Sequence, residues 1–186
     1  MTIKLNKLTF QEINETLKKN KIDVVIGNKC PISFIECPEL DSLFDKTIII
    51  KERDKVVACL GFSINKTKIH IDASCTETKS RNKGYNSLGQ ILLFYYAIYK
   101  KVPYMTSDAN KQSQSIMKKL FLSKCSDEYM SPNYDFNCVV NVNDSNVRLN
   151  VYKNLENLLK KIKPSRTNTK SKSKSRSKSK SKSRSR

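Results

Sequence analysis

One stretch of the chain decides the fold and reads Glu77-Thr-Lys-Ser-Arg-Asn-Lys-Gly-Tyr-Asn-Ser-Leu-Gly-Gln-Ile-Leu-Leu-Phe-Tyr-Tyr-Ala97. A strand-like segment, Lys68 to Cys75, precedes it, and a basic loop with a single glycine, Arg81 to Asn86, lies near its start. The following residues are apolar and predict a helix from about Ser87 to Lys100. A strand, a glycine loop and a helix N-terminus in this order predict a cradle for an anion, because loop N–H groups and the positive end of the helix dipole converge there.

A helix capping box and the alternation of apolar and polar residues predict the helix and the strands before this stretch. Thr9 and Glu12 form a capping box for a helix from Phe10 to Asn20. Short polar turns separate the later strands and favour an antiparallel meander. In its last strand we expect Ile69 and Ile71 on one side and His70 and Asp72 on the other. The predicted strands are Asp23–Ile26, Thr47–Lys51, Lys55–Ser63 and Lys68–Cys75.

A strand at Pro103–Ser107 follows the central helix. Strand, crossover helix and strand imply a parallel pair with the helix packed across it. We also expect helices at Lys111–Leu122 and Val147–Ile162 and a strand at Asn137–Val142. The sequence therefore predicts an α/β (α+β) fold for residues 1–164: a mixed sheet with an antiparallel meander, a parallel pair around a crossover helix, and flanking helices.

The motif Arg81-x-x-Gly84-x-Asn86, placed between a strand and an apolar helix, resembles the GNAT acetyltransferase superfamily. The family signature there is Arg/Gln-x-x-Gly-x-Gly/Ala. After the next strand, Asn110, Ser113 and the apolar positions behind them are spaced like the family's second motif. By element order the resemblance covers about Ile3 to Val142. It implies a GNAT-like mixed sheet and transfer of an acetyl group from acetyl-CoA to an unidentified amine.

The resemblance also implies which residues form the site. Ala73, Ser74 and Cys75 are expected beside the pantetheine arm of acetyl-CoA, and Asn110 is expected to approach from the other side. Glu77 is the expected general base, ahead of His70 and Asp72. The loop residues expected to contact the pyrophosphate are Arg81, Asn82, Lys83, Gly84, Tyr85 and Asn86.

Three positions depart from the family pattern. Asn86 replaces a small residue, and we expect the loop to keep its shape because asparagine tolerates left-handed dihedrals. Met117 stands where many members carry a tyrosine that acts as general acid, and methionine cannot donate a proton. Phe121 stands where glycine is usual. Two alternatives therefore stay open: a basic surface loop before a core helix, and a scaffold without activity. The aromatic run Phe94–Tyr96, together with Tyr99, is expected to pack in the core with some hydroxyls at the surface.

The six cysteines could indicate disulfides or zinc. No two are spaced as C-x-x-C and His70 is the only histidine, so no metal site is expected. Cys59 and Cys75 lie in apolar, strand-like runs, where reduced buried thiols are usual. The N-terminus also lacks the apolar region of a signal peptide. We therefore expect reduced cysteines in an intracellular protein, cytoplasmic or nuclear, and no apolar run of about 18 residues predicts a transmembrane segment.

The last residues form a second functional element. Among 186 residues the net charge is +19, and residues 166–186 contribute +10 of it with no acidic residue. From Lys170 onward serine alternates with lysine or arginine, a pattern that resembles protamine-like and Arg/Ser-repeat segments. Residues 165–186 are expected to be disordered, and residues 166–186 to bind nucleic acid or another polyanion without sequence preference. The alternatives are a solubilising tail or an import signal. If six cations contacted duplex phosphates, the logarithm of the binding constant would fall with the logarithm of the salt concentration with a slope of about −5.

Two functions from different classes follow. The first is an acetyl-CoA-dependent N-acetyltransferase whose tail binds polyanions. The alternative is a catalytically inactive GNAT-like scaffold that serves as a nucleic-acid-binding or virion-associated structural protein. The abundance of lysine, asparagine and isoleucine is typical of an AT-rich genome, and together with the tail it favours a large DNA virus as the source, with the protein in the viral factory or the virion.

Overall fold

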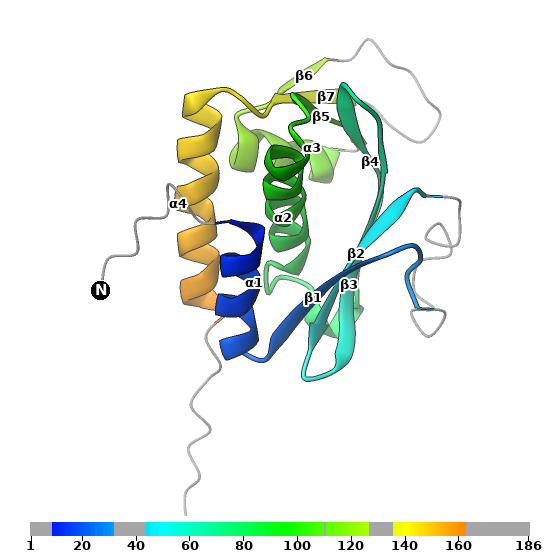
Figure 1. Ribbon diagram of the computed structural model, residues 1–186, viewed down its shortest axis with the longest axis vertical. Helices are drawn as coiled ribbons and strands as arrows, with labels where there is room; N and C mark the ends of the chain where they lie inside the picture. The colour runs from blue at the N-terminus through cyan, green and yellow to red at the C-terminus, as the bar shows by residue number, and fades with distance from the viewer. Residues whose placement is uncertain (1–8, 32–43, 110, 127–135, 163–186) are drawn as a thin grey trace, which may run out of the picture.

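The computed structural model describes residues 9–31, 44–109, 111–126 and 136–162. They form one sheet of seven strands in the order β1-β2-β3-β4-β5-β7-β6, with the four α-helices gathered on one side of it (Figure 1). A short 3-10 helix, Thr78–Ser80, follows β4. The elements are α1 Phe10–Lys19, β1 Ile22–Gly27, β2 Lys46–Glu52, β3 Lys55–Ile64, β4 Lys68–Thr76, α2 Tyr85–Lys100, β5 Tyr104–Ala109, α3 Lys111–Phe121, β6 Lys124–Ser126, β7 Phe136–Asn141 and α4 Ser145–Lys161.

The predicted meander and parallel pair are confirmed. β1 to β4 pair antiparallel in chain order, and β4 pairs parallel to β5 across the helix α2. The capping box of α1 is also present, because the Thr9 hydroxyl accepts from the Glu12 backbone while the Glu12 carboxylate accepts from the Thr9 backbone. The sequence missed β6, a strand of three residues, which is too short to show a periodic pattern.

A bulge on β4 changes which side chains face the helices. Asp72 is the extra residue, since its neighbours Ile71 and Ala73 pair with consecutive residues of β3. Before the bulge Ile71 lies in the main core under the helices. After it Ala73 and Cys75 lie in a separate cluster on the other face, which we call the outer face of the sheet. A bulge re-aims the strand that follows it, and here it does so beside the candidate site.

β4 and β5 part after a short paired stretch. Their pairing runs from Lys68 and Tyr104 to Ile71 and Ser107. β4 then continues to Thr76, and β5 continues on the other side while pairing with β7. The parallel pair therefore opens on one side of the sheet at the position of the bulge.

The helix α2 lies at the centre of the core beneath the sheet. Residues 91–97 are all buried, although they include two tyrosines. The Phe94 ring stacks on Phe121, with ring centroids 5.7 Å apart, and Tyr96 meets Phe62 edge-on at 5.7 Å. Phe121 thus fills the core at the position where the family pattern has glycine. The aromatic run packs in the core as predicted, whereas Tyr99 is 71% exposed.

The expectation of reduced cysteines is wrong for both residues on which it was based. Cys30 and Cys59 form a disulfide with Cα atoms 6.1 Å apart, and Cys75 is also disulfide-bonded. Cys59 and Cys75 lie opposite each other on β3 and β4, in the outer-face cluster. Cys30 reaches this cluster from the end of β1, across 29 residues of sequence. A local apolar pattern cannot show such a long-range pairing.

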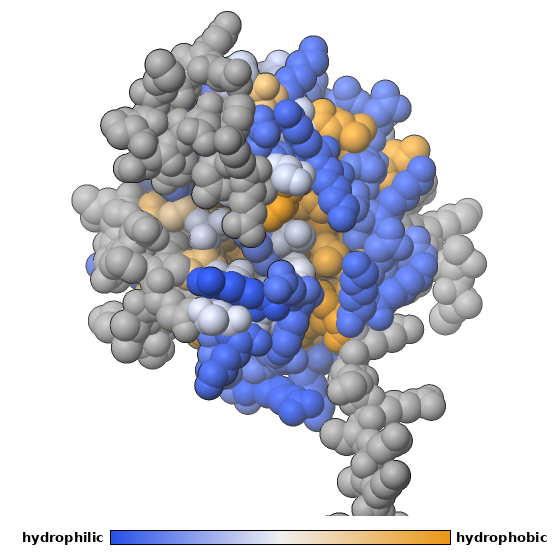
Figure 2. Space-filling model, turned by 180° about the vertical axis from the view of Figure 1, so that it is seen from behind, coloured by the Kyte–Doolittle hydropathy of each residue, from blue (hydrophilic) through white to orange (hydrophobic). Residues whose placement is uncertain are grey.

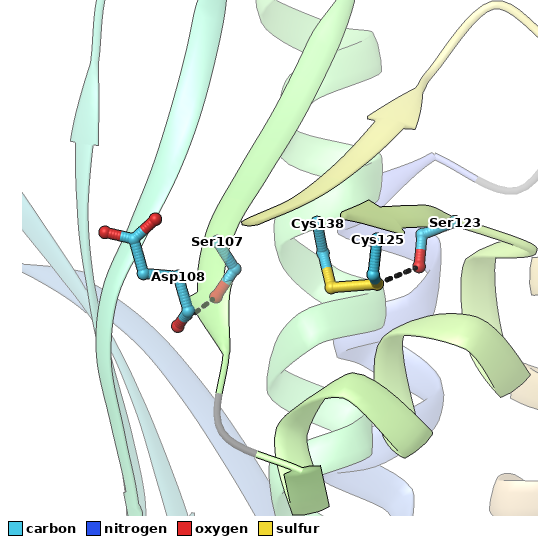
Figure 3. The surroundings of a disulfide bond; sticks show 5 residues. All are labelled: Ser107, Asp108, Ser123, Cys125 and Cys138. Atoms are coloured by element: carbon cyan, nitrogen blue, oxygen red, sulfur yellow. Dashed lines mark hydrogen bonds between the residues drawn. A yellow bond between two sulfur atoms is a disulfide. The ribbon is translucent and has the colours of Figure 1, made fainter. Parts of the chain in front are cut away.

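A further disulfide joins Cys125 on β6 to Cys138 on β7. Figure 3 shows it between the two strands, with the Ser123 hydroxyl 3.5 Å from the Cys125 sulfur. Disulfides form and persist in oxidising environments. The prediction of a reducing compartment depended on reduced cysteines, so these disulfides remove its support.

The described surface is mainly hydrophilic when seen from behind, with hydrophobic patches between the polar residues (Figure 2). Among the helices described, none has the length and hydropathy that crossing a bilayer requires. The predicted domain boundary at residue 164 and the tail lie outside the described residues.

Candidate functional site

A cavity of about 570 Å³ opens where β4, the loop after it and the start of α2 meet α3. β4 contributes the residues that follow the bulge, and α3 contributes two side chains from the opposite wall. Polar groups dominate the part formed by the loop. The lining residues are Ser74, Cys75, Thr76, Arg81, Asn82, Gly84, Tyr85, Asn86, Ser87, Ser113 and Ile116.

The N-terminus of α2 forms the polar end of this cavity. Gly84 is the N-cap residue, and no side chain caps the helix. The first N–H groups of a helix have no partner within the helix, so those of α2 are available to an anion at the positive end of the helix dipole. Gly84 has φ +89°, and a Cβ there would lie 2.6 Å from Leu158 Cδ2 of α4. The positive φ therefore favours glycine at this position, whereas the close contact is with the end of a flexible leucine side chain, which can shift.

Asn86 does not use a left-handed conformation, contrary to the expectation. It lies in the first turn of α2, and its side-chain oxygen accepts a hydrogen bond from Gln90 Nε2 at 3.1 Å. The left-handed residue of the loop besides Gly84 is Asn82, with φ +64°. The loop keeps its shape because these two positions turn it, so a larger residue in the helical position 86 is accommodated.

The two cations of the loop, Arg81 and Lys83, differ in their position relative to the cavity. Arg81 lines it, and its Nε donates to the Thr76 carbonyl at 3.4 Å. Lys83 is not among the lining residues and forms an ion pair with Glu52 at 3.6 Å. Tyr85 lies beneath the loop, where burial and a hydrogen bond with Glu52 raise the pKa of its phenol. The phenol therefore stays neutral.

The predicted cofactor-binding residues divide into those at the cavity and those away from it. Ala73 packs in the outer-face cluster instead, because the bulge turns it there. Asn110 lies outside the described residues. Sequence reasoning missed Thr76 and Ser87, although strand alternation beyond Ser74 and the first turn of the helix could have indicated them. The predicted residues that line the cavity are Ser74, Cys75, Arg81, Asn82, Gly84, Tyr85 and Asn86.

The carboxylate of Glu77 is held away from the cavity. It forms an ion pair with Lys55, at the start of β3, and accepts a hydrogen bond from the Ser80 hydroxyl at 2.9 Å. The hydrogen bond from Lys55, followed by the one from Ser80, lowers the pKa of Glu77 below its usual value. A carboxylate stabilised in this way is a weak base. The structure therefore does not bring the expected base to the cavity.

The position of the expected general acid is part of the core. Met117 is 1% exposed and lies on the buried face of α3. Its neighbour Ile116 lines the cavity together with Ser113, one turn earlier on the helix. The wall formed by α3 is therefore apolar apart from the hydroxyl of Ser113.

A second cavity of about 320 Å³ adjoins the first and shares Ser87 and Ile116 with it. It runs between α3 and α4, and both helices contribute lysine and polar side chains to it. The residues that line the two cavities extend from β4 to the last turn of α4. The other lining residues of the second cavity are Ser115, Lys119, Leu120, Asn154, Asn157, Leu158 and Lys161.

The chain matches no protein-family model and none of the curated proteins. Solved structures match it by shape. A GNAT family acetyltransferase from Elizabethkingia anophelis with acetyl-CoA bound aligns with a TM-score of 0.51 and 11% identity, over 65% of this chain and 98% of that chain. The domain has a GNAT-like fold. Ard1 from Thermoplasma volcanium aligns with a TM-score of 0.50 and 12% identity, over 65% and 99% of the two chains. At these identities the likeness establishes the GNAT-like fold alone, so the chemistry of the site rests on its own residues.

Proposed function

We propose that the protein is an acetyl-CoA-dependent N-acetyltransferase that acts on an amine. The observation that carries the proposal is the uncapped N-terminus of α2, which opens into a cavity beside the parting strands β4 and β5. A diphosphate fits free N–H groups at a helix N-terminus. The acetyl-CoA-bound enzyme of the same fold supports this choice of ligand.

The lining residues offer chemically suitable groups for each part of such a ligand. The backbone N–H groups of residues 84–87 and the Arg81 guanidinium would hold the pyrophosphate. Ser74 and Thr76 would lie beside the pantetheine arm, with Ser113 on the opposite wall. The second cavity, with Lys119 and Lys161, would take the nucleotide end. The bound ligand supplies an activated acetyl group as a thioester, and the chain's own residues orient it.

Acyl transfer to an amine requires a group that takes a proton from the nitrogen and one that protonates the leaving sulfur. Neither expected residue is available for this, because Glu77 is paired with Lys55 and Met117 is buried. These two observations favour a second candidate, the catalytically inactive scaffold. The cavity is shared by both candidates, so acetyl-CoA binding alone does not separate them.

Calorimetric titration of the full chain with acetyl-CoA tests the proposal. Gly84→Asp and Gly84→Asn form a matched pair, because both side chains have one shape and tolerate positive φ, but only aspartate places a negative charge at the anion site. We expect a Kd for Gly84→Asp at least tenfold above that for Gly84→Asn, since a like charge close to the pyrophosphate opposes it. Equal affinities for the pair, or no binding by the wild type, would overturn the proposal.

Release of free thiol from acetyl-CoA separates enzyme from scaffold. An active enzyme should release coenzyme A faster in the presence of primary amines than without them. Binding without amine-dependent release, over a panel that includes lysine peptides and polyamines, would establish the scaffold instead.

We also propose that residues 166–186 bind nucleic acid or another polyanion. Ten cations and no acid in 21 residues support this, and the eight serines from Ser171 to Ser185 would reverse the sign of the charge if phosphorylated. Retention on duplex DNA at low salt should be strong for the full chain and weak for residues 1–164. Equal retention of the two proteins would count against the tail as the binding element.

A further inference from the structure

A cluster of polar side chains lies on the outer face of β4 and β5, opposite the helices. The imidazole of His70 has its Nδ1 atom 2.8 Å from the Thr106 hydroxyl. Its Nε2 atom lies 3.8 Å from a carboxylate oxygen of Asp108 and 4.0 Å from one of Asp72. The three charged or titratable side chains are only about one quarter exposed, at 28% for His70, 24% for Asp72 and 28% for Asp108.

The parallel register of the two strands creates this cluster. His70 pairs with Thr106, and Asp108 lies two residues further along the same face of β5. Figure 3 shows Asp108 extending away from the side of β5 on which Ser107 and the Cys125–Cys138 disulfide lie. The cluster is therefore separate from the core and from the lining of the cavity.

The two carboxylates of the cluster have no lysine or arginine partner within the described residues, and the His70 imidazole pairs with them only when it is protonated. Neither Asp72 nor Asp108 forms an ion pair with a lysine or arginine there, although the whole chain carries a net charge of +19. Lys68, two residues before His70 on β4, is exposed and forms no ion pair with them. Asp72 accepts a hydrogen bond from the Ser63 hydroxyl at 2.7 Å, which leaves most of its acceptor capacity unused.

The distances in the cluster fit an inserted ammonium group. Separations of 3.8 and 4.0 Å are too long for direct hydrogen bonds. When Nδ1 of His70 donates to Thr106, Nε2 becomes an acceptor that lies within 4.0 Å of a carboxylate oxygen of both Asp72 and Asp108. A primary ammonium group has three N–H donors, and its charge-assisted hydrogen bonds are about 2.7–2.9 Å long. One such nitrogen can therefore bridge acceptors at the observed separations.

The position of the cluster links it to the cavity. Asp72 is the bulged residue at which β4 and β5 part, and Ser74, two residues later, lines the cavity from the other face. A ligand whose thioester lies past Ser74 would thus meet, through the opening between the strands, a group held by the cluster. The two reactants would thus meet at the opening between β4 and β5.

We propose that His70, Asp72 and Asp108 form the binding site for a cationic primary amine, the acceptor of the reaction. This inference rests on the proposed function for its role in catalysis, but amine binding is measurable by itself. The chemical class of the acceptor is then a lysine-like or polyamine side chain rather than a neutral aromatic amine, because two carboxylates select a positive charge.

The single histidine of the chain makes a direct test possible. In the full chain labelled with ¹³C-histidine, the imidazole signals come from His70 alone. With coenzyme A present, we expect Nα-acetyl-lysine amide to shift these signals saturably, and its uncharged Nε-acetylated form to leave them unchanged. Asp108→Asn should raise the Kd of the amine about tenfold, since a charge-assisted hydrogen bond becomes a neutral one.

Asp54→Asn is the matched control, because Asp54 is exposed in the turn between β2 and β3 and loses the same charge at a distance from the cluster. It should bind the amine as the wild type does. Calorimetry with acetyl-CoA should give the wild-type affinity for Asp108→Asn. An unshifted His70 signal, or equal effects of Asp108→Asn and Asp54→Asn, would overturn the amine site. Amine binding without acetyl-CoA binding would instead leave the amine site intact and refute the proposed function.

Discussion

Removal of the Cys30–Cys59 disulfide should lower the free energy of unfolding by about 3.6 kcal/mol. The bridge closes a loop over a sequence separation of 29 residues, and the chain-entropy relation converts that length into this value at 25 °C. The Cys125–Cys138 bridge has a separation of 13, for which the same relation gives about 2.9 kcal/mol. The two disulfides should therefore differ in effect, in the order of their loop lengths.

Urea unfolding of Cys30→Ala/Cys59→Ala and Cys125→Ala/Cys138→Ala, followed by circular dichroism without reductant, measures both values. For a domain of this size, a loss of about 3.6 kcal/mol lowers the Tm by roughly 7–14 °C. Peptide mapping after alkylation of the unreduced, denatured wild type checks the premise, because bridged cysteines cannot be alkylated. Alkylation of Cys30 and Cys59, or a double variant as stable as the wild type, would refute the reasoning.

Three further predictions concern the site and its surroundings. Gly84→Ala should lower the free energy of unfolding by about 1–2 kcal/mol, because alanine is strained in a left-handed conformation. Gly89→Ala inside α2 should raise it by about 0.5–1 kcal/mol, because a Cβ there meets its neighbours no closer than 3.6 Å and alanine favours the helix. Urea unfolding of the two variants checks that the changes have opposite signs. Burial raises the pKa values of Tyr85 and Tyr95. The stability that depends on their neutral phenols is complete below the ordinary tyrosine pKa of about 10 and is lost as the pH rises above it. An alkaline absorbance titration should therefore show two tyrosines that ionise at a higher pH than the others. The lowered pKa of Glu77 contributes stability above the ordinary glutamate pKa of about 4.3 that is lost as pH falls; Lys55→Met should reduce this acid loss, and an unchanged pH profile would argue against the pairing.

Local patterns were sufficient to predict most of the fold. The capping box at Thr9, the alternation of the meander and the apolar run of α2 each depend on neighbours within a few residues, and all are present. The anion cradle was predictable for the same reason, since Arg81 to Asn86 is one continuous loop. The crossover helix then determined the parallel pairing of β4 with β5.

What the sequence did not reveal depends on contacts between distant segments. The disulfide of Cys59 needs a partner 29 residues away, and the ion pair that withdraws Glu77 comes from Lys55 on another strand. Asp108 was overlooked because only the parallel register brings it next to His70. The bulge at Asp72 likewise follows from strand pairing and moves Ala73 out of the site.

The central claim is that the backbone at the start of α2 binds the pyrophosphate of acetyl-CoA. Titration of the ¹⁵N-labelled full chain with coenzyme A, followed by amide chemical shifts, tests it most directly. We predict that the largest saturable shifts fall on Gly84, Tyr85, Asn86 and Ser87, with smaller ones along Ser74 to Thr76. Saturable binding with its largest shifts on other elements, or no shift in residues 84–87, would contradict the account.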